Sequence, residues 1–468
     1  MRKCLIAAVM LSAAVVFASC ERNDNSVPEC NLVISMGSDG NTVRVSVAPS
    51  DESVDYLYGI IMEDDYAALG EDGLVSYINE LISKGAELKQ GSSSELYSDL
   101  FWHTRYYAFA AQVNDGTVYG TPVVESIRTY RPYVDFAPEG VLIAPYAVSD
   151  NGLWVVGNYD DGANSNSYIY DVRRDELTVI QGCVLYDITD AGVAYGKDIA
   201  GPVYYENGQI VPVQAPAGSS ESGFYGVSPD GAVAVGYSMD ENWNNEAIIY
   251  ENGTLSNLTG TDLGGNTPVG IIAKGIGSNG NIAGYLTDFD YYVELGCLWL
   301  GASHEFNLFP KEFMTEFNED MGAWTKRYGD LEMHISPNGK FLSAWVYVTE
   351  SWESQPQYAY VYDIEGEKMY EVSDNAYNEW RPCAVTSDGL LFLSDAKAGV
   401  SSQPYVYDFN TGNVETFKDY ASATWGYSSE DAVFEGSVLA VSDDASVIVG
   451  NYSDESNFYT TIYFMPEK

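Results

Sequence analysis

The chain has few residues of the types on which most catalytic and metal sites depend. It contains three histidines, and beyond Cys4 and Cys20 it has four cysteines that lie far apart in sequence. No C-x-x-C pair, H-E-x-x-H run or glycine-rich phosphate loop occurs, so the sequence offers no zinc, redox or nucleotide motif. The sequence leaves the pairing of these four cysteines open and favours isolated buried thiols: Cys30, Cys183, Cys297 and Cys383.

Positive charge is scarce as well. Lys and Arg number 22 against 68 Asp and Glu, which gives a formal net charge of −46. A surface of this sign repels polyanions, so no nucleic-acid partner is predicted, while neutral ligands, cations and basic partners remain open. The acidity does not indicate disorder, because 46% of the residues are hydrophobic and 38 tyrosines are interleaved with the acids.

Long apolar runs are missing after the first residues. Arg2 and Lys3 precede an apolar stretch, 5–17, that is too short for a permanent membrane helix. It ends in Phe17-Ala18-Ser19-Cys20, which resembles the lipobox of bacterial lipoproteins. The resemblance implies cleavage before Cys20 and lipidation of its thiol. The alternative is a plain secretory signal followed by a chance cysteine.

The N-terminal segments are therefore predicted to anchor the chain and not to fold. Residues 1–19 would be a lipoprotein signal peptide, and residues 20–29 a polar tether that begins at the lipid. The predicted location is the cell envelope, in the outer membrane of a Gram-negative bacterium, with the protein either periplasmic or surface-exposed.

Residues 30–128 predict a small β domain that contains one helix. Leu74, Ile78, Leu81 and Ile82 recur at helical spacing, and Asp115-Gly116 is a hairpin turn signal. Strands are predicted for the runs 32–34, 43–47, 56–62, 106–113 and 121–127.

The end of this domain resembles a fibronectin type III domain. In that family a Leu-x-Pro-x-Thr-x-Tyr run packs a tyrosine at a corner of the sandwich, and Leu100, Thr104 and Tyr106 match it. Trp102 stands where the family has proline. The resemblance implies a β-sandwich, here with an inserted helix in place of the middle strands. Residues 129–140 are predicted to be a proline-stiffened linker.

Residues 141–468 are built from a repeat in which two apolar stretches flank a polar turn. The clearest unit, 226–258, alternates four strands with a Ser-Pro-Asp-Gly turn, a loop and an Asn-Gly turn. One such unit cannot bury its own faces, whereas units packed radially can, so the repeat predicts a β-propeller. The seven turns are 149–152, 189–192, 228–231, 278–280, 336–339, 387–389 and 442–445.

This unit resembles the HAF-type extracellular repeat. Its Ser-Pro-Asp-Gly turn and the Tyr-Asp ending of its third strand are also similar to the WD40-like family. The resemblance implies a propeller and an exported location, and it implies no particular activity. The predicted fold is therefore all-β: a fibronectin type III-like β-sandwich with an inserted helix, followed by a seven-bladed β-propeller over 141–468.

The loops between the second and third strands of the units are predicted to form a ligand face. All but one combine Asp, Glu or Asn with an aromatic residue. A ring covers the apolar face of a sugar while carboxylates and amides accept from its hydroxyls. Any single loop is better explained as an ordinary solvated loop, and only the recurrence of the pattern over the face supports a neutral glycan or a protein ligand. The candidate residues are Asp160, Asp161, Asn164, Asp240, Asn242, Trp243, Asp288, Asp290, Tyr291, Trp352, Glu353, Asp454 and Phe458.

Metal binding and catalysis have less support in the sequence. The run Asp160-Asp161-x-x-Asn164 suggests calcium, but its spacing fits no EF-hand loop, and no metal or cofactor is predicted. His103 is assigned to the first domain and His334 to a first strand, where a packed core histidine is expected. No catalytic residue is predicted.

Three functions remain open at this point. The leading hypothesis is a binding or scaffold module of the cell envelope. The first alternative is a carbohydrate-active enzyme, a glycosidase or lyase, because paired carboxylates are defined by spatial separation and not by spacing in sequence. The second alternative is an assembly subunit of an envelope complex.

The segment 306–330 interrupts the repeat. Phe309, Phe313 and Phe317 recur every four residues, which predicts a helix packed on the rim of the propeller. Because Lys311, Lys326 and Arg327 add scarce positive charge, a protein-docking element is the alternative.

Overall fold

The computed structural model divides the chain into two compact units. The first comprises Met1–Ser38, Thr42–Ser98 and Arg105–Ile127, and the second Asp39–Asn41, Asp99–Thr104 and Arg128–Lys468. No helix within the described residues is long and apolar enough to cross a membrane. The structure describes residues 30–70, 73–136, 141–160, 165–262, 265, 270–288, 293–309, 317–318, 323–324, 326–328, 333–348, 357–372, 380–395, 404–427, 436–453 and 458–465.

The first unit holds two three-stranded sheets and a pair of helices. Its sheet orders are β1-β2-β4 and β3-β5-β6, and both helices lie between β3 and β4 in the chain. The predicted helix is confirmed as α2, whose Ile78 is buried against Leu57 and Phe109. The elements are β1 (Leu32–Asp39), β2 (Thr42–Pro49), β3 (Tyr56–Met62), α1 (Glu63–Leu69), α2 (Gly73–Ser83), β4 (Ser93–Tyr97), β5 (Arg105–Asn114) and β6 (Thr117–Arg128).

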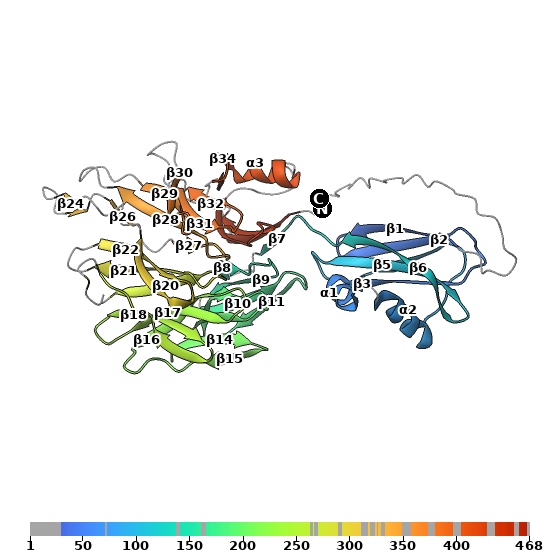
Figure 1. Cartoon of the computed structure of the whole chain (residues 1–468), viewed down its shortest axis with the longest axis horizontal. Helices are drawn as coiled ribbons and strands as arrows, with labels where there is room; N and C mark the ends of the chain where they lie inside the picture. Colours follow the sequence, from blue (N-terminus) through green and yellow to red (C-terminus); the bar gives the residue numbers. More distant parts are fainter. Residues whose placement is uncertain are drawn as a thin grey trace. The chain divides into compact units, whose positions relative to one another are not determined.

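The second unit is a β-propeller made of small antiparallel sheets that follow one another around a common centre (Figure 1). In Figure 1 the colours run from green to red around this ring, with β8, β20 and β27 toward its middle. The innermost strands are β8 (Leu142–Val148), β12 (Val184–Ile188), β16 (Glu221–Val227), β20 (Ile271–Ile276), β27 (His334–Ile335), β31 (Trp380–Val385) and β35 (Ser437–Val441).

Three further strands complete each sheet toward the outside. The second strands are β9 (Trp154–Asp160), β13 (Ala194–Lys197), β17 (Val233–Met239), β21 (Ile282–Asp288), β28 (Phe341–Val348), β32 (Leu390–Asp395) and β36 (Val447–Ser453). The third strands are β10 (Ser165–Asp171), β14 (Pro202–Glu206), β18 (Asn245–Glu251), β22 (Val293–Leu300), β29 (Gln357–Asp363), β33 (Tyr405–Asp408) and β37 (Phe458–Phe464). The outer strands are β11 (Glu176–Ile180), β15 (Gln209–Pro212), β19 (Thr254–Asn257), β23 (Glu305–Phe309), β30 (Lys368–Val372), β34 (Asn413–Thr416) and β7 (Tyr133–Phe136).

Hydrophobic clusters hold neighbouring sheets together face to face. Val235 and Ile249 of one sheet, for example, pack with Ile271 and Trp299 of the next. A comparable cluster joins the last sheet to the first and includes Ile462. Each sheet is thus covered on both faces, which explains why its strands are apolar on both sides.

Strand β7 closes the ring from the opposite end of the chain. It pairs antiparallel with β37, so that a strand from before the first sheet becomes the outer strand of the last one. Thr461 Oγ1 donates to Asp135 Oδ1 at 2.6 Å across this pair. The segment 129–140, predicted to be a linker, therefore contains a propeller strand, because its Tyr-Val-Asp-Phe run fits the open edge of β37.

The repeated polar turns connect the first and second strands as the sequence predicted. In several of them the first hydroxyl is buried and accepts the N–H that opens the second strand, as Ser228 Oγ does from Val233 at 3.0 Å. The fourth position has positive φ, for instance 73° at Gly231, which favours glycine there. Ala445 takes that position in the last turn with φ 53°.

The helix predicted around Phe309 and Phe317 is wrong at both residues. Phe309 ends the outer strand β23, and Phe317 lies in β24 (Phe317–Asn318), while Phe313 falls outside the described residues. Pairing of Phe309 with Gly296 on β22 imposes a period of two where the sequence shows a spacing of four. The remaining short elements are η1 (Gly301–Ser303), β25 (Ala323–Trp324), β26 (Lys326–Tyr328), α3 (Phe417–Tyr420) and η4 (Ala421–Trp425).

Candidate functional site

A central cavity, called the channel below, lies among the innermost strands of the propeller, and β-bulges aim side chains into it. In most innermost strands the pairing with the second strand slips by one residue three or four positions before the turn. A bulge leaves this extra residue unpaired and re-aims its side chain. The bulged residues, all of which line the channel, are Tyr146, Tyr186, Tyr225, Lys274, Cys383 and Leu439.

Glycines on the second strands make room for these bulges. Gly236 pairs with Phe224 beside the bulged Tyr225, and Gly196 pairs with Leu185 beside Tyr186. A Cβ on Gly236 would lie 2.0 Å from the carbonyl oxygen of Gly223, so no larger residue fits without moving the backbone. The glycine is therefore part of the device that points a neighbouring side chain at the channel.

Three of the bulged residues form a continuous tyrosine arc, defined as Tyr146, Tyr186 and Tyr225. The ring centroids lie 5.5 Å apart for Tyr146 and Tyr186, and 5.1 Å apart for Tyr186 and Tyr225. The arc continues at Lys274, whose amine is 3.7 Å from the centroid of the Tyr225 ring, a cation–π contact. Three neighbouring innermost strands thus present an aromatic wall that ends in a cation.

Lys274 and His334 form the basic side of the channel. Burial lowers the pKa of Lys274 to about 8. The pKa of His334 is lowered to about 4. Burial is the main cause and the charge of Lys274 a smaller one, while a hydrogen bond to the backbone of Pro382 acts in the opposite direction. The imidazole is therefore neutral at physiological pH, while most of the lysine is protonated.

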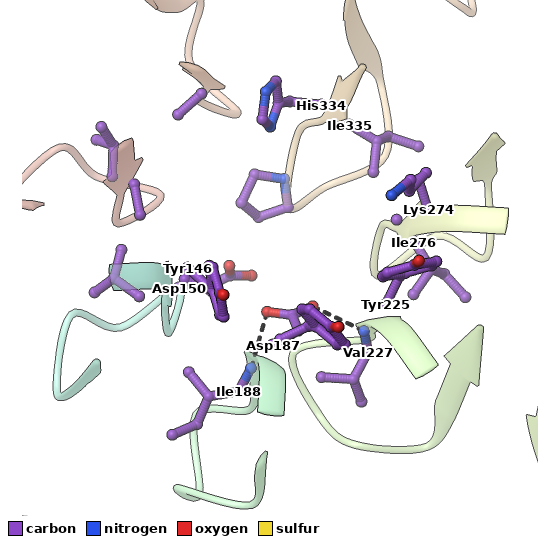
Figure 2. Close-up of a pocket in the computed structure, with 18 of the residues that line it drawn as sticks. Tyr146, Asp150, Asp187, Ile188, Tyr225, Val227, Lys274, Ile276, His334 and Ile335 are labelled. Atoms are coloured by element: carbon purple, nitrogen blue, oxygen red, sulfur yellow. Dashed lines mark hydrogen bonds between the residues drawn. The ribbon is translucent and has the colours of Figure 1, made fainter. Parts of the chain in front are cut away.

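Asp187 and Asp150 form the acidic side of the channel. The two oxygens of Asp187 accept backbone N–H groups from Ile188 and from Val227 of the next sheet, both at 2.8 Å (Figure 2). Burial raises the pKa of Asp187 to about 6 in spite of these bonds. The pKa of Asp150 rises to about 8, first through burial and then through the nearby carboxylates of Asp187, Asp190 and Asp443.

The channel opens at the face that carries the polar turns. The inner cavity has a volume of about 220 Å³, and a wider mouth of about 600 Å³ shares Asp150, Pro229 and Pro337 with it. Bonds between turns form the rim, such as Asn151 N–H to Asp190 Oδ1 at 2.8 Å. The arrangement can hold a small polar ligand between opposite charges, since carboxylates accept hydrogen bonds and the lysine donates them.

The predicted ligand face lies at the other end of the sheets, because a second strand ends opposite the turn from which it starts. The best described of its loops is the turn between β17 and β18. There Asp240 Oδ1 accepts the N–H groups of Asn242 at 2.7 Å and Asn244 at 3.0 Å, so this carboxylate shapes the turn. Trp243 projects from it with 77% of its surface exposed and φ 65°.

The other candidate residues are described only in part. Asp160 ends β9, Asp288 ends β21 and Phe458 begins β37, which places all three at the same face as Trp243. The residues that fall outside the described residues are Cys20, Asp161, Asn164, Asp290, Tyr291, Trp352, Glu353 and Asp454.

His103 and the three buried cysteines take structural places, whereas His334 and Cys383 line the channel. The segment that holds His103, assigned to the first domain by sequence, belongs to the second unit, where the ring stacks on Phe464 at 3.8 Å. Burial and the charges of Arg131 and Arg128 lower the pKa of His103 to about 3. The four cysteines are free thiols; Cys30, Cys183 and Cys297 are buried as predicted, whereas Cys383 is only half-buried. No group of three or more potential metal ligands occurs among the described residues.

The channel residues were not among the sequence candidates. Lys274 stands in the run Ile-Ile-Ala-Lys-Gly-Ile, which resembles an ordinary strand, and strand alternation gives no warning of a bulge. The sequence does contain a signal, because each bulged residue falls six positions before the last residue of the turn that follows it. Aligning the repeats on their turns would have placed the tyrosine arc and Lys274 in one ring.

Comparison with known proteins finds no family and only distant structural likenesses. No family model matches the chain, and no curated protein matches it. Similar solved structures include an oligogalacturonate lyase from Vibrio parahaemolyticus, with 11% identity, a TM-score of 0.47, and coverage of 72% of this chain and 97% of that one. The propeller domain of the Trilobed protease from Pyrococcus furiosus has 10% identity, a TM-score of 0.35, and coverage of 70% and 86%.

A third similar structure is the Dos1 propeller, with 11% identity, a TM-score of 0.39, and coverage of 72% of this chain and 95% of that one. The last two of these structures are propellers, the fold that the sheet order of the second unit shows by itself. Because every TM-score is below 0.5, no activity, ligand or partner follows from the likeness.

Proposed function

We propose that this protein is a lipid-anchored component of the cell envelope whose propeller is a binding module. The lipobox-like run that ends at Cys20 supports the anchor, which we assign to the outer membrane of a Gram-negative bacterium. The strand order of the first unit supports a fibronectin type III-like sandwich with inserted helices. Seven turns and the sheets that they join support a ring of seven blades.

The observation that carries the binding role is the presentation of Trp243. An exposed tryptophan gains little for folding, yet Asp240 holds its turn with three hydrogen bonds, including one from Asn244 Nδ2 at 3.0 Å. A rigid flat ring beside carboxylates and amides suits the C–H face of a neutral sugar or an apolar patch of a protein. We therefore assign the partner, a neutral glycan or a protein, to the face that carries Trp243.

The test is electrophoresis of the chain from Glu21 onward in gels that contain single neutral or acidic polysaccharides. Retardation by a neutral glycan that is lost in Trp243→Ala would support a glycan site. Ile199→Ala is the matched control, because Ile199 is also an exposed hydrophobic residue and lies in the corresponding loop between β13 and β14. Equal loss in both variants, or no retardation on any glycan, would contradict the glycan proposal, and capture of a protein partner by wild type but not Trp243→Ala would support the protein alternative.

A carbohydrate-active enzyme is the second proposal, and the channel favours it. Asp150, Asp187 and Lys274 face one cavity with pKa values shifted toward neutrality, which is a common property of acid–base sites. The test is incubation with each polysaccharide, followed by measurement of new reducing ends. Cleavage by wild type that Asp187→Asn abolishes would support a glycosidase or lyase, and intact polymer would contradict it.

A further inference from the structure

The two sides of the channel carry opposite charges that the protein itself leaves unmatched. Figure 2 shows Lys274 and His334 on one side of the open centre, with Asp150 and Asp187 on the other. Lys274 affects the pKa of His334, but no carboxylate perturbs the pKa of Lys274. The cavity is therefore a preformed dipole, with a cation at one side and carboxylates at the other.

Lys274 lacks an anionic partner among the residues that the structure describes. Its amine faces the Tyr225 ring at 3.7 Å, and that contact recovers only part of the cost of removing a charge from water. An acid group placed in the cavity would complete the ion pair. An unmatched charge in a preformed cavity favours binding of a ligand of opposite charge. Folding has already removed much of the hydration of Lys274, so pairing with the ligand requires little further loss of hydration on the protein side.

The carboxylates opposite are unmatched in the same way. Each oxygen of Asp187 accepts one backbone N–H, which leaves further lone pairs for a ligand donor. Asp150 accepts no side-chain or backbone hydrogen bond on its carboxylate within the described part of the chain, and it stands near the carboxylates of Asp190 and Asp443. At pH 7 a pKa of about 8 leaves Asp150 mostly protonated in the free protein, and an ammonium group bound there would favour its ionised form.

We propose that the channel is a binding site for a small zwitterion, with its acid group against Lys274 and its amine against Asp187 and Asp150. The inner volume of about 220 Å³ is smaller than the roughly 300–1,000 Å³ of pockets for drug-sized ligands, so the ligand is small. The tyrosine arc provides an apolar wall for the carbons between the two charged ends, and the wide mouth admits the ligand. This site is separate from the Trp243 face and does not rest on the function proposed there.

The test uses three matched probes on the chain from Glu21 onward. They are 6-aminohexanoate, hexanoate and hexylamine, which share a carbon chain and differ in their end groups. Binding is measured by calorimetry at pH 7, where the lysine is mostly protonated and Asp187 mostly ionised. We expect the zwitterion to bind about tenfold or more tightly than either singly charged probe, because only it engages both sides.

Variants separate the two ends of the site. Lys274→Met should lose the advantage of the zwitterion over hexylamine, and Asp187→Asn should lose its advantage over hexanoate. Lys418→Met, at an exposed lysine of α3, is the control and should bind as wild type does. Lys274→Met should also keep or raise the unfolding midpoint of the free protein, since it removes an unmatched charge, so lost binding cannot be attributed to lost folding.

Three outcomes would overturn the proposal. One is the absence of binding by all three probes, and another is equal binding by the zwitterion and hexylamine. The third is a zwitterion advantage that survives in Lys274→Met. None of these outcomes bears on the glycan or protein face, because Trp243 is not part of the channel.

Discussion

The backbone N–H of Asp443 donates a 3.0 Å hydrogen bond to the carbonyl oxygen of Asp150. The bond joins the turn of the last sheet to the turn of the first, so the rim of the channel closes through the backbone. The same Asp443 accepts the N–H of Ser387 from the preceding turn at 2.7 Å. Closure of the rim therefore brings the carboxylates of Asp443 and Asp150 close to each other.

This crowding of acids should make the propeller less stable as the pH rises. Folding raises the pKa of Asp150 from 3.8 to about 8 and that of Asp187 to about 6, so the folded chain binds more protons than the unfolded chain between these values. Stability is then lost as the pH rises from about 4 to about 8. Between pH 6 and pH 8 we expect the unfolding midpoint to fall by about 2–4 °C, a value reduced for the partial exposure of Asp150.

Asp150→Asn is the variant that isolates this effect. It removes the group that titrates in the upper half of the window and leaves the general repulsion of an acidic chain unchanged. The slope of the midpoint between pH 6 and pH 8, measured by scanning calorimetry at constant ionic strength, should flatten. An unchanged slope would assign the pH dependence to net charge and not to the channel.

Gly236→Ala should disturb the channel through the backbone. The new Cβ would lie 2.0 Å from the carbonyl oxygen of Gly223, so the bulge at Tyr225 has to shift. We expect a loss of about 1–3 kcal/mol in unfolding free energy. Gly37→Ala is the matched control, because nothing lies within 4 Å of a Cβ at that strand position. Denaturant titration followed by fluorescence measures both, and equal losses would refute the role assigned to Gly236.

Truncation of two tryptophans should change the unfolding free energy by very different amounts. Trp299 is 0% exposed, packs on Phe306 with ring centroids 5.6 Å apart, and donates from Nε1 to the Thr259 carbonyl at 2.7 Å. Trp299→Ala should cost about 3–5 kcal/mol of unfolding free energy. Trp243→Ala should change it by no more than about 0.5 kcal/mol, because the side chain is largely exposed. A large loss for Trp243→Ala in denaturant titration would show that this ring stabilises the fold and is not held ready for a partner.

Strand β7 should matter more than an ordinary outer strand. Replacing Tyr133–Phe136 by Gly-Ser-Gly-Ser keeps the chain length but removes the side chains that cover β37. The same replacement of Thr254–Asn257, which is β19, is the control. We expect the β7 replacement to lower the thermal midpoint more than the β19 replacement does and to speed proteolysis. The reason is that the first and last sheets of the propeller would no longer be held together by the β7–β37 pair. Equal effects would mean that β7 adds a strand without closing the ring.

The sequence predicted the elements whose chemistry is local. The turn that begins at Ser228 could be read directly, because its hydroxyl, proline and glycine each meet a requirement of the turn itself. The helix at Leu74–Ile82 was likewise found from its spacing. In contrast, the spacing of Phe309 and Phe317 indicated a helix, and pairing with β22 overrode it at Phe309. A local period cannot reveal which neighbouring strand will compete for the segment.

The candidate site was harder to predict, because it depends on contacts between repeats. Asp240 was chosen as a ligand residue, yet its carboxylate is occupied by the N–H groups of its own turn. The sequence gives no signal for Asp187, because its partner Val227 lies in the next sheet and the two residues line the channel only in the folded ring. Only the assembled ring brings such residues together, so the sequence predicts the loops more readily than the residues of the central channel.

Where a glycine is paired beside a bulge, the residues that maintain the sheet differ from the residue that faces the channel. In most sheets a glycine on the second strand accommodates the bulge, and the extra residue across from it faces the channel. The extra residue has no partner in the ladder, so it can be exchanged without breaking one. The bulged positions around the channel can therefore be substituted one at a time to change its ligand specificity while the strand pairing stays the same.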